Sequence, residues 1–284
     1  MREILSCLLT AMFSMQAVRA QTIRRAVTTD YIAQTVYSVT QLDAFSFISN
    51  QASLAKIKKT TGGIYGERRF MLTELSLYNS VVVIPTQAGN FGLKAGYHGF
   101  GAYHETEAGL AYGRSLGDKI DMGVQFNYNA ISVAGYGSAS ATGFEAGVIF
   151  HLTDRLNAGI HLRNPVGGKF GGNAKEKLPF VYTAGLGYEA SDNFFVSTGM
   201  EKEEDEPVNI TAGIQYKVVP PLLVRAGIST ATSSWWLGFG VVIHSIRIDA
   251  TASFHPQLGI TPGIMLLFNV ALASTGENPA NTGS

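Results

Sequence analysis

Polar and apolar residues alternate strictly along many short stretches of the chain. In residues 120–129, Ile, Met, Val, Phe and Tyr occupy every second position, and Asp, Gly, Gln and Asn stand between them. The same pattern recurs in 156–163, 208–217 and 246–255. Because successive side chains of a β-strand point to opposite faces, each stretch predicts a strand with one apolar and one polar face.

Turn residues separate these stretches, and together they predict fourteen strands between residues 61 and 272. The connections are too short for the crossover that parallel strands require, so neighbouring strands are expected to form antiparallel hairpins. One set of turns is short, whereas the other set includes the longer connections Ala130–Ala141 and Asn164–Pro179. The expected strand starts are Thr61, Leu75, Phe91, Glu105, Lys119, Thr142, Arg155, Phe180, Phe194, Val208, Leu222, Trp235, Ile246 and Gly263.

Aromatic residues decide between a soluble β-sandwich and a membrane barrel, since both would show this alternation. They form two rows near the strand ends of the apolar face, and such rows, on strands of about ten residues, are typical of outer-membrane barrels. We therefore predict an all-β fold, a transmembrane antiparallel up-and-down β-barrel with both ends on the periplasmic side. One row is Tyr112, Phe150, Tyr188 and Tyr216, and the other is Tyr97, Tyr128, Tyr182, Trp235 and Phe254.

The composition agrees with a chain that lies in lipid. Charged residues make up 15% of the sequence, against roughly 25% in soluble domains. No later segment approaches the ~20 continuous apolar residues of a membrane-spanning helix, and a closed barrel is the other way to satisfy the backbone in a bilayer. We expect outer-membrane lipid as a partner. Nucleic acid is not expected, because 21 basic residues are balanced by 21 acidic ones.

The N-terminus has the pattern of a cleaved secretory signal, with a cytosolic N-terminal helix as the alternative. The apolar run Ile4–Met15 precedes Val18 and Ala20, which are small residues at the −3 and −1 positions of a cut before Gln21. The only cysteine, Cys7, lies in this segment, so the mature chain would have no disulfide and no thiolate ligand. The expected divisions are a signal peptide at 1–20, an N-terminal plug or periplasmic segment at 21–60, the barrel at 61–272 and a polar tail at 273–284.

Two segments resemble a known family. Residues 43–55, with Asn50, Gln51 and Ala52 at their centre, are similar to the Asn-Pro-Ala segment before the barrel of FadL-like outer-membrane proteins, the long-chain fatty-acid transporter type. Gln51 replaces the family proline. Residues 66–76 are similar to the PorV/PorQ branch, which is associated with type IX secretion. The resemblance covers most of the mature chain and implies fourteen strands and a short N-terminal plug segment folded into the lumen.

The polar strand faces supply the candidate site residues. They are interpreted either as a lumen that holds or passes a ligand, or as charges that pair with one another and with the plug inside a filled barrel. Three aromatic side chains also project to the polar side. The candidate ligand-binding or lumen-lining residues are Tyr65, Lys94, Asp121, Gln125, Arg163, Phe195, Arg225, Trp236, Arg247 and Asp249.

Catalysis and metal binding are not expected. Asp249, Ser253 and His255 lie on one face of one strand, but residues two apart on a strand are separated by ~7 Å, which is too far for a nucleophile and its base. The six histidines show no metal-ligand spacing. The sequence therefore predicts no metal site, no cofactor and no enzyme.

Two functions remain open. The FadL-like resemblance implies an outer-membrane barrel that binds or passes hydrophobic small molecules. The PorV/PorQ resemblance implies an accessory barrel that docks secretion-system proteins without transport activity. Tyr65, Phe195 and Trp236 on the nominally polar face favour the first function.

Overall fold

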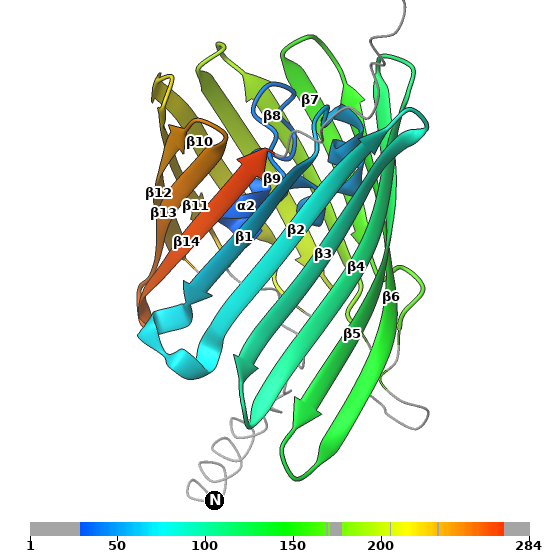
Figure 1. Ribbon diagram of the computed structural model, residues 1–284, viewed down its shortest axis with the longest axis vertical. Coiled ribbons are helices and arrows are strands. Elements are labelled where there is room, and N and C mark those ends of the chain that lie inside the picture. The colour runs from blue at the N-terminus through cyan, green and yellow to red at the C-terminus, as the bar shows by residue number, and fades with distance from the viewer. Residues whose placement is uncertain (1–28, 169, 171–177, 205, 232, 270–284) are drawn as a thin grey trace, which may run out of the picture.

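The fold is a closed antiparallel β-barrel (Figure 1). The computed structural model describes residues 29–168, 170, 178–204, 206–231 and 233–269, so the predicted signal peptide and polar tail lie outside the described residues. Each strand pairs with its neighbours in sequence, and β1 closes the barrel on β14 from Thr61↔Asn269 to Glu67↔Gly263. This confirms the prediction of fourteen strands. The strands are β1 (Thr61–Arg68), β2 (Ser76–Thr86), β3 (Gly89–Phe100), β4 (Tyr103–Leu116), β5 (Ile120–Val133), β6 (Gly137–His151), β7 (Leu156–Arg163), β8 (Val181–Glu189), β9 (Phe194–Glu203), β10 (Asn209–Val219), β11 (Leu222–Ser229), β12 (Ser234–Ile243), β13 (Ile246–His255) and β14 (Gly259–Asn269).

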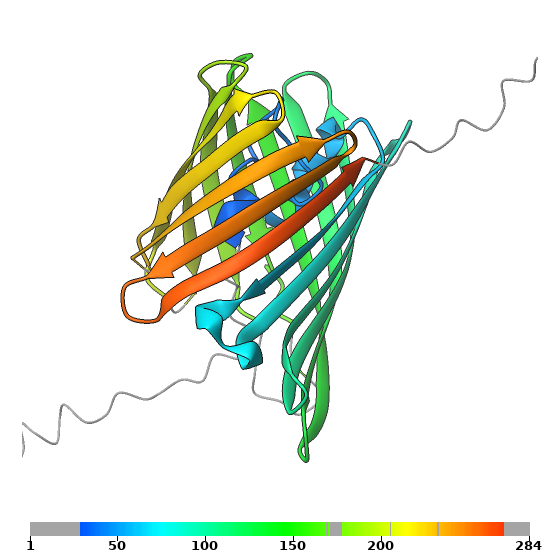
Figure 2. The same ribbon diagram turned by 60° about the vertical axis from the view of Figure 1, so that its left-hand side comes forward.

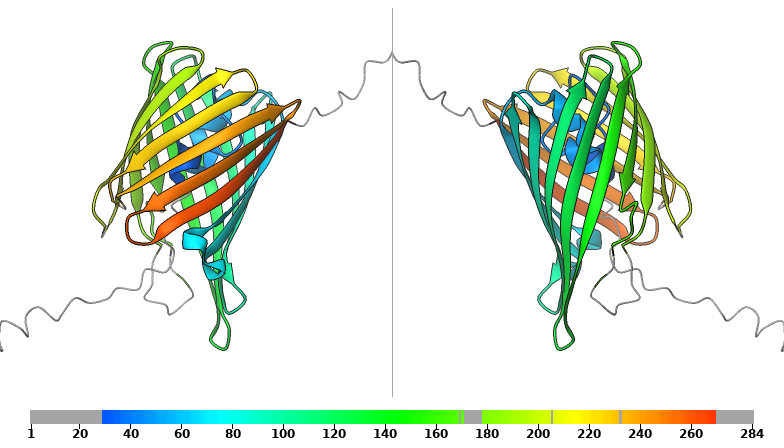
Figure 3. Two further views of the ribbon diagram at one scale, coloured as in Figure 1. Left: turned by 90° about the vertical axis from the view of Figure 1, so that its left-hand side faces the viewer. Right: turned by 90° about the vertical axis from the view of Figure 1, so that its right-hand side faces the viewer.

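One predicted loop was wrong. Most of Ala130–Ala141 belongs to β5 and β6, which pair as far as Val133↔Gly137 and form the hairpin that reaches furthest from the barrel body (Figure 3). Beyond Asn129 the inward positions become apolar, and Ile131 and Ala141 pack inward with Phe170 and Leu178. The two faces of these strand ends are therefore similar in polarity, and because the alternation is absent the sequence pattern did not predict a strand there.

The outer surface of the barrel is apolar and carries aromatic side chains near both ends of the strands. Phe126, Leu110 and Ile264 are at least half exposed. At the end with the short turns, Phe91 packs on Tyr112 and Phe194 on Tyr216, with ring centroids 5.2 Å and 6.1 Å apart. At the opposite end, Trp235 stacks on Phe254 at 3.9 Å. These rows match the predicted interfacial girdles.

The two ends of the barrel differ. Tight turns such as Pro220–Pro221 and His244–Ser245 join the strands at the end where Thr61 and Asn269 lie, which we call the short-turn end. The opposite end carries the β1–β2 connection, with the short helices η2 (Arg69–Met71) and η3 (Thr73–Leu75), and the long connection between β7 and β8. The difference in length is smaller than predicted, because β3–β4 and β5–β6 also turn tightly there.

Residues 29–60 lie inside the barrel (Figures 1 and 2). Residues 29–60, called the plug segment below, form α2 (Thr29–Ala33), α3 (Ser46–Ser49) and the 3-10 helix η1 (Gln51–Lys56). η1 contacts β3 to β6, and α2 contacts β11 on the other side of the lumen. Within the described residues, no helix combines the length and the apolar character needed to cross a membrane.

Candidate functional site

The plug segment is held in the lumen by an apolar core of its own. Phe45, Phe47 and Leu54 are fully buried and pack with inward residues of β1, β2 and β14. Phe45 meets the ring of Tyr65 edge-on at 6.5 Å, and on the other side of the lumen Tyr31 meets Trp236 edge-on at 5.5 Å. The plug therefore occupies the surface that these inward aromatics would otherwise offer to a ligand.

Glycines on the inner face of the wall make room for the plug. A Cβ atom added at Gly147 would lie 2.0 Å from Asn50 Oδ1, and one at Gly123 would lie 2.3 Å from the backbone carbon of Gln51. Plug and wall thus fit together where the wall has no side chain. The inner-face glycines at which a Cβ would come within 3.1 Å of a plug atom are Gly63, Gly92, Gly113, Gly123, Gly147, Gly159, Gly185, Gly187, Gly213 and Gly238.

Asp43 anchors the plug to the β11–β13 side of the barrel. Its Oδ2 accepts hydrogen bonds from Arg225 Nη2 at 3.0 Å and from Arg247 Nη2 at 2.9 Å. Arg247 also binds both carboxylate oxygens of Asp249, and the Tyr31 hydroxyl donates to Asp249 at 2.9 Å. Burial alone would raise the pKa of Asp43, but Arg247 and Arg225 outweigh it and hold that pKa below its usual range.

Glu145 is the second anchor and lies at the centre of the β4–β7 side. Its carboxylate is completely buried and accepts hydrogen bonds from Gln51 Nε2 at 2.7 Å and from Asn127 Nδ2 at 2.6 Å. His161 Nε2 lies 2.9 Å away, and Arg163 Nε lies 3.4 Å away. One buried carboxylate therefore joins the plug to three strands of the wall, and its charge is met by hydrogen bonds and a guanidinium.

The Asn50–Gln51–Ala52 motif forms the turn of the plug that meets the wall. Asn50 Oδ1 accepts the backbone N–H of Ala52 at 3.0 Å and so caps η1. Its amide nitrogen donates to the Ile160 carbonyl of β7 at 3.1 Å. Next to the motif, Lys56 lies 3.4 Å from Asp121, which also accepts from Ser115 and pairs with His151. Gln51, which stands at the position of the proline in the FadL-like segment, contributes its own contact by donating to Glu145.

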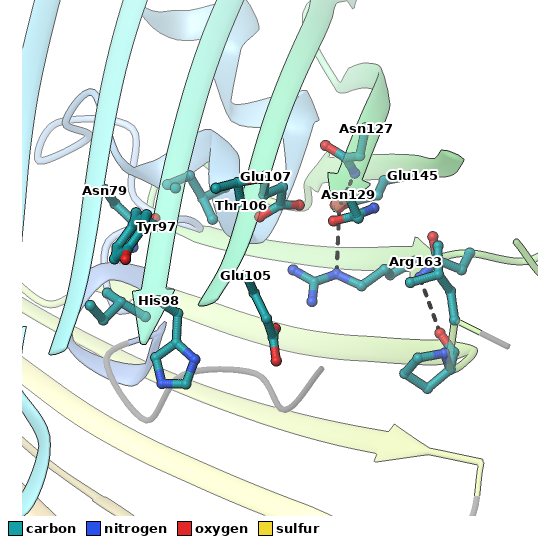
Figure 4. A pocket seen from close by; sticks show the side chains of 16 residues that line it. Asn79, Tyr97, His98, Glu105, Thr106, Glu107, Asn127, Asn129, Glu145 and Arg163 are labelled. Atoms are coloured by element: carbon teal, nitrogen blue, oxygen red, sulfur yellow. Dashed lines mark hydrogen bonds and ion pairs between the residues drawn. The ribbon is translucent and has the colours of Figure 1, made fainter. Parts of the chain in front are cut away.

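A cavity of about 120 Å³ remains between the plug and the wall on the side of the longer connections (Figure 4). Ile48 of the plug, Leu77 of β2 and Leu178 form its apolar wall. Glu105, Glu107, Asn127, Asn129 and Arg163 form the polar side, and the guanidinium of Arg163 extends into the space. We call this space the Arg163 cavity.

Two further cavities flank the plug. One of about 50 Å³, the Trp236 cavity, lies between the plug and β8–β12. The other, of about 460 Å³, lies at the short-turn end and is lined by Lys56, Lys58 and Lys59 together with the β12–β13 turn. The plug thus divides the lumen into separate compartments.

The structure places every predicted lumen-lining residue on the inner face, where most of them are engaged by other protein groups. Arg163 lines the Arg163 cavity, and Trp236 lines the Trp236 cavity. Tyr65 and Phe195 pack among the plug and the wall. Asp121, Gln125, Arg225 and Asp249 are fully buried, while Lys94 lies 2.8 Å from Glu107. The interpretation of a filled barrel with paired charges accounts for these contacts. A role of these residues in ligand binding remains a prediction.

Asp249, Ser253 and His255 do not form a catalytic arrangement. Asp249 is engaged by Arg247 and Tyr31, while His255 Nδ1 accepts the backbone N–H groups of Gln257 and Leu258 at 3.2 Å. In the part of the chain that the structure describes, no group of three His, Cys, Asp or Glu side chains is placed to hold a metal ion.

The sequence analysis missed the plug residues Tyr31 and Asp43 and the wall residue Glu189 of β8 as groups that hold the plug in the lumen. Glu189 Oε1 accepts from the Ser38 hydroxyl at 2.6 Å and from the backbone N–H of Val39 at 3.0 Å. One signal for them was present: many positions of the polar strand faces are glycine, and a row of inward glycines indicates that another part of the chain approaches the wall.

Comparisons with known proteins show the fold. No protein-family model matches the chain, and no curated protein is similar to it in sequence. The chain is similar in structure to the toluene transporter TodX of P. putida (TM-score 0.59, 11% identity, 82% of this chain and 95% of that chain). It is also similar to the toluene transporter TbuX of Ralstonia pickettii (0.57, 12%, 80% and 94%) and to a Pseudomonas aeruginosa FadL homologue (0.55, 12%, 84% and 96%). The predicted FadL-like fold is thereby confirmed.

Proposed function

We propose that this chain is an outer-membrane barrel that binds or passes hydrophobic small molecules, and that the plug segment keeps the lumen closed between ligands. The observation that supports this most directly is the Arg163 cavity, about 120 Å³ in volume, between Ile48 of the plug and Leu77 of the wall. An apolar protein cavity of about 150 Å³ can hold benzene. By size, the space suits a molecule with one ring or a short aliphatic chain against Ile48, Leu77 and Leu178, and its polar side, which includes Glu105, Glu107, Glu145 and Arg163, suits polar substituents.

Two other features support the proposal. The apolar outer face with its aromatic rows fits a bilayer. The fold is shared with barrels named as toluene transporters and a FadL homologue. The Val18/Ala20 pattern adds export by a cleaved signal peptide to the proposal. Because the plug fills much of the lumen, passage of a ligand requires the plug to break the contacts of Asp43 with Arg225 and Arg247 or that of Gln51 with Glu145.

The test is binding of radiolabelled toluene to the purified barrel in detergent and in lipid nanodiscs. Wild-type protein is expected to bind saturably. Gly96→Leu should abolish binding, because Gly96 lines the Arg163 cavity and a Cβ there would meet the amide oxygen of Asn79 at 2.8 Å and Glu107 Cβ at 3.8 Å. Gly66→Leu, on the outer face beside Tyr78, is the matched control and should bind like wild type. Heat-modifiable mobility on gels shows that each variant is folded.

The accessory-barrel alternative predicts a different set of results. Folded wild-type protein would bind no toluene, no lipid-like molecule would co-purify with it, and a specific protein of a secretion system would be retained by it. That outcome would replace the transport proposal.

A further inference from the structure

The basic side chain of Arg163 reaches into the cavity that is named after it. Among the described residues, Arg163 is the only lysine or arginine in the lining of this cavity. Figure 4 shows its guanidinium extending from β7 into the space, and its side chain is 20% exposed. A molecule that enters the cavity therefore meets this guanidinium.

Most of the hydrogen-bonding capacity of this guanidinium is unused. A guanidinium has five N–H donors and no acceptor. Within the described residues, the side chain of Arg163 has a single polar contact, between its Nε and Glu145 Oε1 at 3.4 Å. The two terminal nitrogens, Nη1 and Nη2, point into the cavity (Figure 4). Because these nitrogens can only donate, a bound molecule can pair with them only through an acceptor.

The charges around Arg163 are already balanced. Arg163 lies beside Glu145, and Glu107, which also lines the cavity, pairs with the buried Lys94 at 2.8 Å. Lys94 lies 3.8 Å from Glu145 as well, so two cations meet two carboxylates. A ligand carboxylate would bring in a negative charge that this cluster does not match, and an unmatched charge away from water is costly. The cluster therefore favours a neutral acceptor, such as a carbonyl or a nitrile, over an anion.

The rest of the lining sets the size and polarity of the remaining part of the ligand. Ile48, Leu77 and Leu178 form apolar surface in the same cavity of about 120 Å³, which is close to the size that holds one ring. A pure hydrocarbon would cover the Arg163 guanidinium without pairing it. A ring with an acceptor substituent would cover the apolar surface and also accept a hydrogen bond from the guanidinium.

We propose that Arg163 determines the specificity of this site, and that its ligands are neutral molecules with one ring and one hydrogen-bond acceptor, bound with the acceptor at the Arg163 guanidinium. This inference rests on the proposed function, since it uses the same cavity. It names the class that the cavity selects among hydrophobic small molecules.

Toluene and benzonitrile test the inference, because they share the ring and differ in a nitrile that accepts a hydrogen bond without donating one. The dissociation constants of both are measured with the folded barrel in lipid nanodiscs, for wild type and for Arg163→Met. The ratio of the two constants is compared between the variants, which cancels the partition of each compound into lipid. This ratio should favour benzonitrile about tenfold more in wild type than in Arg163→Met, as expected for a hydrogen bond to a charged group. Toluene binding should change little.

The infrared stretch of the bound nitrile adds a readout that a loss of packing would not move. A nitrile that accepts a hydrogen bond absorbs at a higher frequency than one in an apolar medium, so the band should move to lower frequency in Arg163→Met. Gln51→Met is the matched control, because it also removes a partner of Glu145 but does not line the cavity. It should keep the preference for benzonitrile and the band position. If Arg163→Met does not fold, Arg163→Gln, which keeps a donor near Glu145, takes its place.

The possible results separate this inference from the proposed function. A preference for benzonitrile and a band position that both depend on Arg163 support the inference. A ratio that Arg163→Met leaves unchanged, with toluene still bound, overturns the role of Arg163 and leaves the proposed function standing. Benzoate bound by wild type as tightly as benzonitrile overturns the neutral class. If folded wild type binds neither toluene nor benzonitrile, the proposed function and this inference both fail.

Discussion

Asp43→Asn tests whether the ion pairs on Asp43 hold the plug in the barrel. The substitution keeps the size of the side chain and removes its charge. Arg247 retains Asp249, but Arg225, which is completely buried, loses the one carboxylate that pairs with it among the described residues and keeps Gln215 and the ring of Tyr31, 4.9 Å away. Removing one partner of a buried ion pair costs about 3–5 kcal/mol. Because Arg247 remains paired, we expect the lower end, about 3 kcal/mol, which is a shift of about a hundredfold in the docking equilibrium of the plug.

Thiol labelling measures that equilibrium. The only cysteine of the sequence, Cys7, lies in the predicted signal peptide, so the mature chain offers a cysteine-free background. Ser53→Cys places a thiol in η1 at a residue that is 1% exposed and whose hydroxyl has no partner among the described residues, so the substitution itself removes no hydrogen bond. The rate of maleimide labelling, divided by the rate in unfolded protein, gives the fraction of time for which the plug is open.

Asp43→Asn should raise this labelling rate about a hundredfold while the barrel stays folded. Asp154→Asn, at an exposed turn, is the matched control and should leave the rate unchanged. A rise of less than about fivefold would be the size expected of a solvent-exposed pair. With the barrel shown to be folded, such a result would refute the reasoning that these buried contacts hold the plug.

Four further predictions concern the plug, the barrel wall and the N-terminus. The pKa of Asp43 is lowered in the folded protein, so Asp43 stabilises the plug fully above its ordinary pKa of about 4, and this stabilisation is lost as the pH falls through the lower folded value. In that pH window the plug should open more often, which can be measured as faster cleavage by an acid-active protease. The increase should be smaller in Asp43→Asn. Gly123→Ala should destabilise the barrel by about 1–3 kcal/mol in urea unfolding, because its Cβ would meet the plug backbone, whereas Gly66→Ala on the outer face should be nearly neutral. Val124→Arg should lower the free energy of unfolding by about 2–4 kcal/mol if Val124 lies mid-bilayer, with Val124→Leu as the control. Gln125→Arg would be tolerated if Gln125 faced an open polar lumen, but it should also destabilise the barrel because Gln125 is only 1% exposed. Mass spectrometry of the mature protein should give Gln21 as the first residue, and intact Met1 protein in the cytosol would contradict the predicted signal.

Much of the barrel could be predicted from the sequence because a strand between lipid and lumen must alternate. Ile120–Asn129 shows that alternation in full, and the structure places its five apolar residues outward and its polar residues inward. Strand number, hairpin order and the outer aromatic rows are local or periodic properties, so they can be read along the chain. The β5–β6 hairpin was missed where both faces became similar in polarity, since periodicity then carries no information.

The contacts inside the lumen could not be predicted, because they join residues far apart in sequence. Asp43 meets Arg225 and Arg247 across about two hundred residues, and Gln51 meets Glu145 across 94. No local pattern shows which inward charge pairs with the plug or which inward glycine packs against it. The sequence by itself determined a lipid-facing wall with a polar interior. Only the tertiary structure decided which inward groups hold the plug segment and where small spaces remain beside it, because those outcomes depend on how closely two distant surfaces fit.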